Sequence, residues 1–155
     1  MLTKNFKDAI KLICNKLRGK SINFAFIGSV SLNLQGIDVA PNDLDLIISI
    51  PGLKVISEEF KDGITQPASK KPYFKEGYPD YYELKLKIND VLVHVMGEYD
   101  NDLYMSRINE GNVVLVKLDY ISVPCLALKS EAEAYSEMGR NKKVKLIRDY
   151  LNKKD

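Results

Sequence analysis

The sequence predicts a single α/β (α+β) domain in which helices flank a mixed β-sheet and a helical pair forms the C-terminal part. Three observations lead to this fold class. Helical and strand patterns alternate in the first part of the chain, a hairpin signal occupies the middle, and two helical stripes follow. A length of 155 residues suits one domain with a sizeable core. We expect a sheet-containing core over 1–123 and C-terminal helices over 124–155.

The first part of the chain alternates between two periodicities. Apolar residues recur at helical spacing before Gly19, whereas two later apolar runs are short and continuous, as buried strands are. Ser29 and Ser31 are candidate caps for a short helix between these strands, which Gly36 would end. The expected elements are a helix over 6–17, a strand over 22–27, a helix over 29–36, a strand over 43–49 and a helix over 51–60.

The second part predicts a loop, a hairpin, further strands and two helices. Residues 61–79 carry three prolines, two glycines and several lysines, the composition of a long loop. Asn89-Asp90 is a two-residue turn signal between strands at 81–88 and 91–96. Further strands are expected at 112–118 and 120–124, followed by one helical stripe of Cys125, Leu128, Ala132 and Tyr135 and another of Val144, Ile147 and Leu151.

A turn at Asn89-Asp90 fixes the register of the hairpin and places Lys85 opposite His94. Alternation then separates an apolar face from a face with ionisable groups. The apolar face consists of Leu84, Leu86, Ile88, Val91, Val93 and Val95, and the other face consists of Glu83, Lys85, Lys87, Leu92, His94 and Met96. By the same rule Asp43 and Asp45 share one face of their strand.

The composition is that of a soluble globular protein, with 45% hydrophobic and 28% charged residues. The net charge of +2, from 23 bases and 21 acids, gives no electrostatic argument for nucleic-acid binding. Cys14 and Cys125 lie in apolar runs without metal-ligand spacing, which predicts buried free thiols and a reducing compartment. The charged first segment is typical of neither a signal peptide nor a membrane span, so we expect a cytoplasmic protein without a membrane partner.

Two neighbouring motifs carry the chemical signal: Gly28-Ser29 after the first strand, and Asp43 and Asp45 on the second. Carboxylates at i and i+2 of a strand project from one face about 6.5–7 Å apart. Their repulsion is relieved by a cation, and Mg²⁺ (or Mn²⁺) prefers such oxygen ligands. Gly28 would let a phosphate approach the backbone, and Ser29 would offer its amide and hydroxyl. Together the motifs indicate a nucleoside triphosphate with its metal.

The stretch "FAFIGSVSLNLQGIDVAPNDLDLII" resembles the signature of the DNA-polymerase-β-type nucleotidyltransferase superfamily, and the chain is most similar to its small stand-alone members, the minimal and AbiEii-like nucleotidyltransferases. The tail "LALKSEAEAYSEMGRNKKVKLIRDYL" resembles their C-terminal helical stretch. The resemblance implies transfer of a nucleoside monophosphate from an NTP, with ATP the first choice, to a hydroxyl acceptor, with release of pyrophosphate. It implies that Asp43 and Asp45 bind Mg²⁺ and that Gly28 and Ser29 bind the β- and γ-phosphates.

The chain departs from the family pattern on the third-carboxylate strand, "VLVHVMGE", where His94 replaces an acid. His94 is interpreted as a neutral general base, as a ligand for a metal softer than Mg²⁺, as the mark of a site that binds without catalysing, or as a structural histidine. Glu83 is a candidate for the missing oxygen ligand, and Glu98, beyond the strand, is a weaker one. Lys85 is a candidate for nucleotide binding, and its positive charge is expected to disfavour protonation of His94.

The remaining candidates also have structural explanations. Four tyrosines would suit stacking on a nucleobase, but tyrosine-rich loops more often cover core: Tyr73, Tyr78, Tyr81 and Tyr82. Arg140, Lys142 and Lys143 would suit a triphosphate, but such clusters between helices are usually solvated, and Lys143 replaces the aspartate of the family's Lys-Asp pair. Two functions therefore remain: a nucleotidyltransferase, and a catalytically weakened nucleotide-binding module, such as half of a toxin–antitoxin pair with a small helical protein partner.

Overall fold

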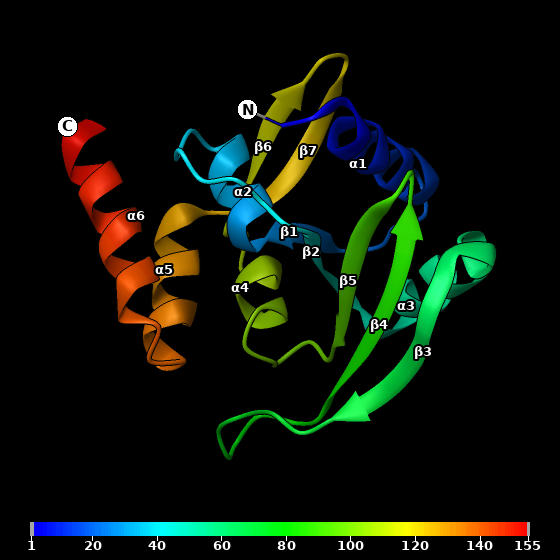
Figure 1. Ribbon diagram of the computed structural model, residues 1–155. Helices are drawn as coiled ribbons and strands as arrows, with labels where there is room; N and C mark the ends of the chain where they lie inside the picture. The colour runs from blue at the N-terminus through cyan, green and yellow to red at the C-terminus, as the bar shows by residue number, and fades with distance from the viewer. Residues whose placement is uncertain (1, 155) are drawn as a thin grey trace.

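The computed structural model describes residues 2–154, which form a seven-stranded mixed β-sheet with helices on both faces, as the sequence predicts (Figure 1). The strand order is β3-β4-β5-β2-β1-β7-β6. The elements are α1 (Lys4–Leu17), β1 (Phe24–Ile27), α2 (Gly28–Leu34), β2 (Leu44–Ser49), α3 (Ile50–Glu59), the 3₁₀ turn η1 (Lys61–Gly63), β3 (Ile64–Lys71), β4 (Tyr81–Ile88), β5 (Val91–Glu98), α4 (Met105–Asn109), β6 (Val113–Leu118), β7 (Ile121–Leu126), α5 (Leu128–Glu137) and α6 (Asn141–Lys154).

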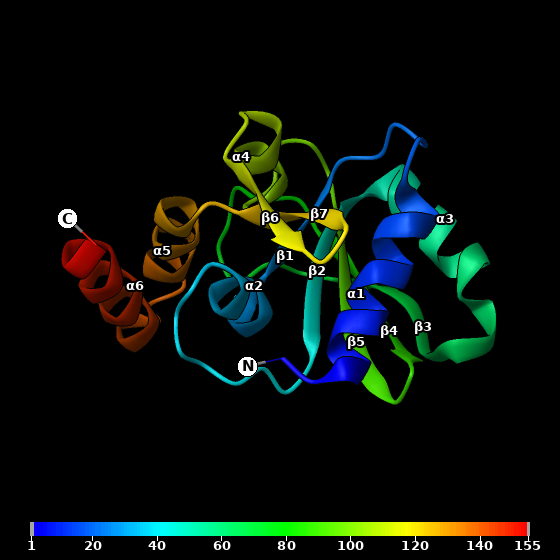
Figure 2. The same cartoon turned by 90° about the horizontal axis from the view of Figure 1, so that it is seen from above.

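Different helices cover the two faces of the sheet (Figure 2). Helices α1 and α3 pack against the apolar side chains of β2, β4 and β5 in one core cluster. Helix α4 packs on the opposite face, against Ala25, Ile27 and Ile47. Helices α2, α5 and α6 share a third cluster. Because side chains alternate along a strand, the ionisable groups of β2 and β5 lie on the face that α4 covers.

Strands β1 and β2 are antiparallel neighbours, with Ile27 opposite Asp45. Helix α2 connects them and starts at Gly28, directly after β1, without a side-chain cap. The prediction that Ser29 or Ser31 opens this helix is therefore wrong. Ser31 is buried and accepts a hydrogen bond from Gln35 Nε2 at 3.0 Å, so its hydroxyl is used inside the fold rather than at the helix start.

The hairpin of β4 and β5 has the predicted register. Ile88 pairs with Val91, and Lys85 pairs with His94. Asn89 and Asp90 both adopt positive φ angles, 51° and 63°, which is the backbone of a type I′ turn. Strand β5 also pairs in parallel with β2, and this pairing places His94 next to Asp45. The register that the turn fixes therefore also determines which β5 residue reaches the aspartates.

Residues 61–79 are not the long loop that their composition predicts. Residues 64–71 form β3, the edge strand beside β4, with shifts of register between Ile64 and Ser69. A proline cannot donate to a ladder and is tolerated at an edge, so Pro67 does not prevent this strand. The irregular connection is confined to residues 72–80. At the other end of the sheet β7 reaches Leu126, so the C-terminal helices start at Leu128 rather than at residue 124.

The two cysteines are free and buried, as predicted, and both belong to the core cluster beneath α1. Burial raises the pKa of each thiol to about 12. Within residues 2–154, none of the helices combines the length and the apolar composition that a membrane span requires.

Candidate active site

The site is built where β1 ends, because Gly28 brings its backbone against a carboxylate of β2. Gly28 has φ +71°, and a Cβ atom at this position would lie 2.5 Å from Asp45 Oδ2. A residue with a side chain would therefore be strained twice, by its backbone conformation and by contact with Asp45. The glycine that the sequence places at the strand end is required for this close approach.

Asp43 and Asp45 are close enough to influence each other. Asp43 lies just before β2, and Asp45 is the second residue of that strand. Burial and the negative charge of Asp45 raise the pKa of Asp43, while His94 and Lys85 oppose the rise. The two carboxylates thus form a half-buried pair whose repulsion is only partly compensated by neighbouring cationic side chains.

His94 lies between two acids. Its Nδ1 is 3.5 Å from Asp45 Oδ1, and its Nε2 is 3.2 Å from Glu83 Oε2. The Nε2 contact is close but lacks the alignment of a hydrogen bond. The Asp45 carboxylate first, and then Glu83, raise the pKa of His94 against the opposing effect of burial. Lys85 was expected to disfavour protonation of His94, but the pKa of His94 is raised, because both acids face the imidazole and Lys85 Nζ lies 3.8 Å from Glu83 Oε1.

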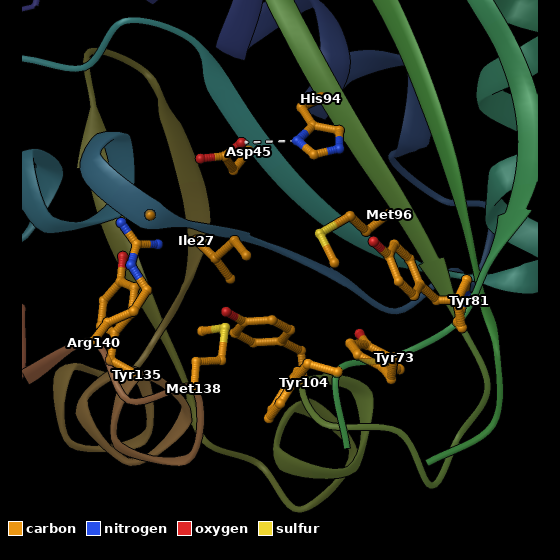
Figure 3. A pocket seen from close by; sticks show the side chains of 13 residues that line it. Ile27, Asp45, Tyr73, Tyr81, His94, Met96, Tyr104, Tyr135, Met138 and Arg140 are labelled. Atoms are coloured by element: carbon orange, nitrogen blue, oxygen red, sulfur yellow. Dashed lines mark ion pairs between the residues drawn. The ribbon is translucent and has the colours of Figure 1, made fainter. Parts of the chain in front are cut away.

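A cavity of about 400 Å³ opens beside these groups (Figure 3). Of the residues expected at the site, Gly28, Asp45 and His94 line it. The other four expected residues (Ser29, Asp43, Glu83 and Lys85) do not line it. Glu83 nevertheless raises the pKa of the lining residue His94, and Lys85 lies beside Glu83. The remaining lining is largely apolar and aromatic and consists of Ile27, Pro72, Tyr73, Phe74, Tyr81, Met96, Tyr104, Tyr135, Met138 and Arg140.

Arg140 is one of these lining residues and is also exposed, so it is solvated, as expected for its cluster, and borders the cavity at the same time. Its guanidinium lies 5.1 Å from the centroid of the Tyr135 ring, and in Figure 3 both side chains stand on the side of the cavity away from Tyr73 and Tyr81. Arg140 is the only Lys or Arg among the described residues that line the cavity. It is therefore the cationic side chain best placed for an anionic ligand.

Glu131 is the buried acid that sequence reasoning missed. Its Oε1 accepts a hydrogen bond from the backbone N–H of Gly28 at 2.7 Å, and burial raises its pKa to about 8. The sequence signal was faint, because an acid within an alanine-rich helical stretch is usually exposed. Since the Gly28 amide is occupied by Glu131, Ser29 provides the next free backbone donor at this turn.

Glu98 has a structural role and does not complete the site. It is fully buried, and its Oε1 accepts hydrogen bonds from the backbone N–H groups of Tyr104 and Met105, at 3.0 and 2.7 Å. It therefore holds the start of α4, and through it the Tyr104 ring, against the sheet. Burial raises the pKa of Glu98 to about 8.

The connection over residues 72–80 is tied to α5. Tyr78 donates a hydrogen bond to Glu137 Oε1 at 2.8 Å, and Arg107 of α4 donates to Glu137 Oε2 at 2.8 Å. Tyr73 in this connection lies beside Tyr81, with ring centroids 4.5 Å apart. Two of the four predicted tyrosines, Tyr73 and Tyr81, therefore line the cavity, while Tyr78 anchors the segment.

The donor set suits a metal ion that arrives with its own oxygen ligands. Among residues 2–154, no three His, Cys, Asp or Glu side chains are grouped closely enough to hold a metal by themselves. The half-buried pair of Asp43 and Asp45 nevertheless offers hard oxygen donors with uncompensated repulsion, and a divalent cation would relieve it. These residues fit Mg²⁺ or Mn²⁺ bound together with a triphosphate.

The fold can be compared with solved structures. TM1012 of Thermotoga maritima, described as a nucleotidyltransferase candidate, is similar over 99% of this chain and 96% of its own, with a TM-score of 0.75 and 22% identity. The chain has a nucleotidyltransferase fold. ANT(2″)-Ia, solved with adenylyl-2″-tobramycin, is similar over 94% of this chain and 89% of its own, with a TM-score of 0.57 and 12% identity. No protein-family model matches the chain, and neither does any curated protein.

Proposed function

We propose that the protein is a small nucleotidyltransferase that moves a nucleoside monophosphate from an NTP, with ATP the first choice, to a hydroxyl acceptor. The observation that carries the proposal is the contact of Gly28 with Asp45 at the mouth of the cavity. The missing side chain of Gly28 leaves room for the Asp45 carboxylate at the end of β1, where a metal and its phosphates would meet the carboxylate pair. The structural similarity to ANT(2″)-Ia, whose complex contains an adenylylated hydroxyl, supports this class of reaction.

The proposed reaction is a displacement at the α-phosphorus. The acceptor oxygen forms a bond to that phosphorus, the bond to the oxygen bridging the β-phosphate breaks, and pyrophosphate leaves with the electron pair. The hydroxyl proton passes to Nδ1 of His94, beside Asp45, because Nε2 is buried against Glu83. Because the pKa of His94 is raised, its basic form is depleted as the pH falls, and transfer should slow on the acid side.

The binding roles follow from the positions of the side chains. Asp43 and Asp45 would hold Mg²⁺ or Mn²⁺, which supplies charge stabilisation to the phosphates when bound. Ser29 and Arg140 would bind the β- and γ-phosphates, with Lys85 supporting the charge balance through Glu83. Gly28 would contribute space rather than a donor, because Glu131 occupies its amide.

A second function is favoured by one observation. His94 occupies the position of the third carboxylate and contacts Asp45 and Glu83. A protonated imidazole at this position would carry the positive charge that a second metal normally provides. A protein of this kind would bind NTP and transfer slowly or not at all. It would then serve as a nucleotide-binding module, such as half of a toxin–antitoxin pair with a small helical partner.

The first experiment measures binding. Isothermal titration with ATP should show binding that requires Mg²⁺ or Mn²⁺, and Asp43→Asn should weaken it strongly because one carboxylate of the pair loses its charge. Asp62→Asn is the matched control, since Asp62 is an exposed aspartate of η1. Wild-type protein without metal-dependent ATP binding would contradict both functions.

The second experiment separates the two functions. His94→Asp restores the third acid and should raise transfer of labelled nucleotide if the natural protein is a weakened binding module. If the wild-type protein transfers as fast as this variant and His94→Ala loses activity, His94 is the working base and the protein is an enzyme. Both variants are compared at equal ATP occupancy, so that binding does not mask the difference.

A further inference from the structure

The cavity has two chemically different sides. In Figure 3, Arg140 and Tyr135 stand on one side, Tyr73 and Tyr81 on the other, and Asp45 lies between Arg140 and His94. The second side is an aromatic wall, which we define as Tyr73, Phe74, Tyr81, Met96 and Tyr104. These five residues come from four places in the chain, namely the 72–80 connection, β4, β5 and the residue before α4.

The aromatic wall is apolar in its surfaces but has polar tips. The hydroxyl groups of Tyr81 and Tyr104 are directed toward the interior of the cavity in Figure 3. The hydroxyl of Tyr73 is covered by protein atoms and has no hydrogen-bond partner among the described residues, so only the ring of Tyr73 is offered to a ligand. Burial raises the pKa values of Tyr81 and Tyr104, so both phenols remain protonated donors.

The direction of the reaction assigns this wall to the acceptor. In phosphoryl-type displacement the attacking and leaving oxygens lie roughly in line on opposite sides of the phosphorus. The leaving pyrophosphate is anionic, and Arg140 is the only Lys or Arg among the described residues that line the cavity, so the triphosphate is expected on the Arg140 side. The attacking hydroxyl must then enter from the opposite side, past His94 and Met96, where the aromatic wall stands.

The charge of the lining limits the chemistry of the acceptor. A polycation would require several carboxylates at the wall, but Asp45 is the only acid among the described residues that line the cavity, and it belongs to the catalytic pair. Glu137 of α5 is engaged by Tyr78 and Arg107, and Glu131 of the same helix is engaged by the Gly28 amide. A cavity of about 400 Å³ is also within the size range of sites for small molecules.

We propose that the acceptor is a small, flat, uncharged molecule with a hydroxyl group on or beside an aromatic ring, bound against the aromatic wall with its hydroxyl toward His94. This proposal rests on the proposed function, because an acceptor exists only if the protein transfers a nucleotidyl group. Stacking and methionine contacts hold the ring, the phenol of Tyr81 bonds its polar atoms, and His94 meets the reacting hydroxyl.

The test uses 2-naphthol, a fluorescent neutral hydroxyaromatic, with tobramycin as the polycationic comparison. The chain contains no tryptophan, so the fluorescence of the probe can be followed without indole background. Titration of the full-length protein should show saturable naphthol binding, with and without saturating Mg²⁺ and ATP. Labelled AMP should then be transferred from ATP to naphthol, and tobramycin should neither bind nor compete.

The variants identify the surface that binds the probe. Tyr81→Leu should weaken naphthol binding about three- to tenfold, the usual contribution of an aromatic pair. Tyr120→Leu is the matched control, because Tyr120 is 70% exposed in the β6–β7 turn, and it should leave binding unchanged. Tyr81→Phe removes one hydroxyl and keeps the ring, so it tests the polar tip if Tyr81→Leu proves unstable in thermal melting.

Three binding outcomes overturn the proposal: no saturable naphthol binding, tighter binding of tobramycin, or equal effects of Tyr81→Leu and Tyr120→Leu. Displacement of naphthol by ATP also overturns it, because that result would assign the wall to the nucleobase. The proposed function fails separately. Its failure is the absence of metal-dependent ATP binding in the same protein, whatever naphthol does. Naphthol binding that persists with bound ATP and responds to Tyr81→Leu supports the proposal.

Discussion

The β4–β5 hairpin has two faces that differ in burial, charge and expected tolerance to substitution. On the face toward α1 and α3, Leu84 and Val95 have no exposed surface. On the face toward the cavity, the side chains of His94 and Lys85 are 26% and 38% exposed and lie among acids. Both faces come from alternate residues of the same two strands, so the contrast arises from side-chain alternation alone.

This difference teaches how a small domain can separate stability from chemistry. Substitutions on the α1 side remove buried apolar surface and should lower the free energy of unfolding. Substitutions on the cavity side alter charges that are partly solvated, and they should change ligand binding more than folding. Each of the following predictions tests whether stability and ligand binding depend on different faces of the hairpin.

The largest effect is expected at Asp45, on the strand next to His94. Asp45→Asn should weaken metal-dependent ATP binding by roughly 2–5 kcal/mol, the range for removing one partner of a close charged pair. The free energy of unfolding should change little, because the amide keeps the size of the side chain at a half-buried position. Titration calorimetry and chemical denaturation measure the two quantities. Unchanged ATP binding would remove Asp45 from the site.

On the face toward α1 and α3, an effect of similar size is expected on the free energy of unfolding rather than on ligand binding. Leu84→Ala should lower the free energy of unfolding by roughly 2–5 kcal/mol, because it leaves a cavity in the closed core. Lys87→Ala, an exposed change on the opposite face of the same strand, is the control and should be nearly neutral. Folded Leu84→Ala protein should still bind ATP with wild-type affinity, and a selective loss of binding would show that the two faces are coupled.

Glu98 tests the separation within the cavity-side face, since this acid shares that face with His94 but is fully buried. The pKa of Glu98 is raised from 4.5 to about 8 in the folded protein. Between these values the folded state keeps a proton that the unfolded state has released, so stability should fall as the pH rises, by up to about 1.4 kcal/mol per pH unit. Glu131 contributes a slope of the same sign over the same range, so Glu98→Gln should reduce the slope of stability against pH in denaturation curves from pH 5 to pH 8 and leave the part that Glu131 contributes.

The smallest effect is expected at Gly28, where a substitution should change both the free energy of unfolding and ATP binding. Gly28→Ala should lower the free energy of unfolding by about 1–2 kcal/mol, the cost of a left-handed conformation for a residue with a side chain. It should also weaken ATP binding, because the new Cβ displaces Asp45. Gly19→Ala is a closely matched control, with φ +74° and nothing within 4 Å, and should lower stability without affecting binding.

Much of the fold could be predicted from the sequence because its strongest signals are local. The Asn89-Asp90 turn fixes one register, and that register places His94 opposite Lys85 and leaves an apolar face for the core. The Gly28 turn and the Asp43–Asp45 pair are likewise short-range patterns, and the structure places them side by side. In each case the spacing of a few neighbouring residues carries the information.

Most of the errors concern interactions between distant parts of the chain, whereas the start of α2 at Gly28 instead of Ser29 or Ser31 is a local one. Strand β3 was expected to be loop, because Pro67 and the lysines hide a ladder that only β4 reveals. Glu131 was not predicted, because its partner, the Gly28 amide, lies 103 positions away in the sequence. The raised pKa of His94 depends on Glu83 and Asp45 reaching it from two other strands, and composition alone gives no measure of such convergence.

The two buried cysteines give the molecule an internal reporter of opening. Cys14 and Cys125 lie on α1 and β7, far apart in the sequence but within one core cluster. Because thiolates react with alkylating reagents and these thiols are buried with pKa values of about 12, labelling requires the core to open. The alkylation rates of the two positions should therefore be equal when the domain unfolds as a unit, and unequal when α1 detaches from the sheet first.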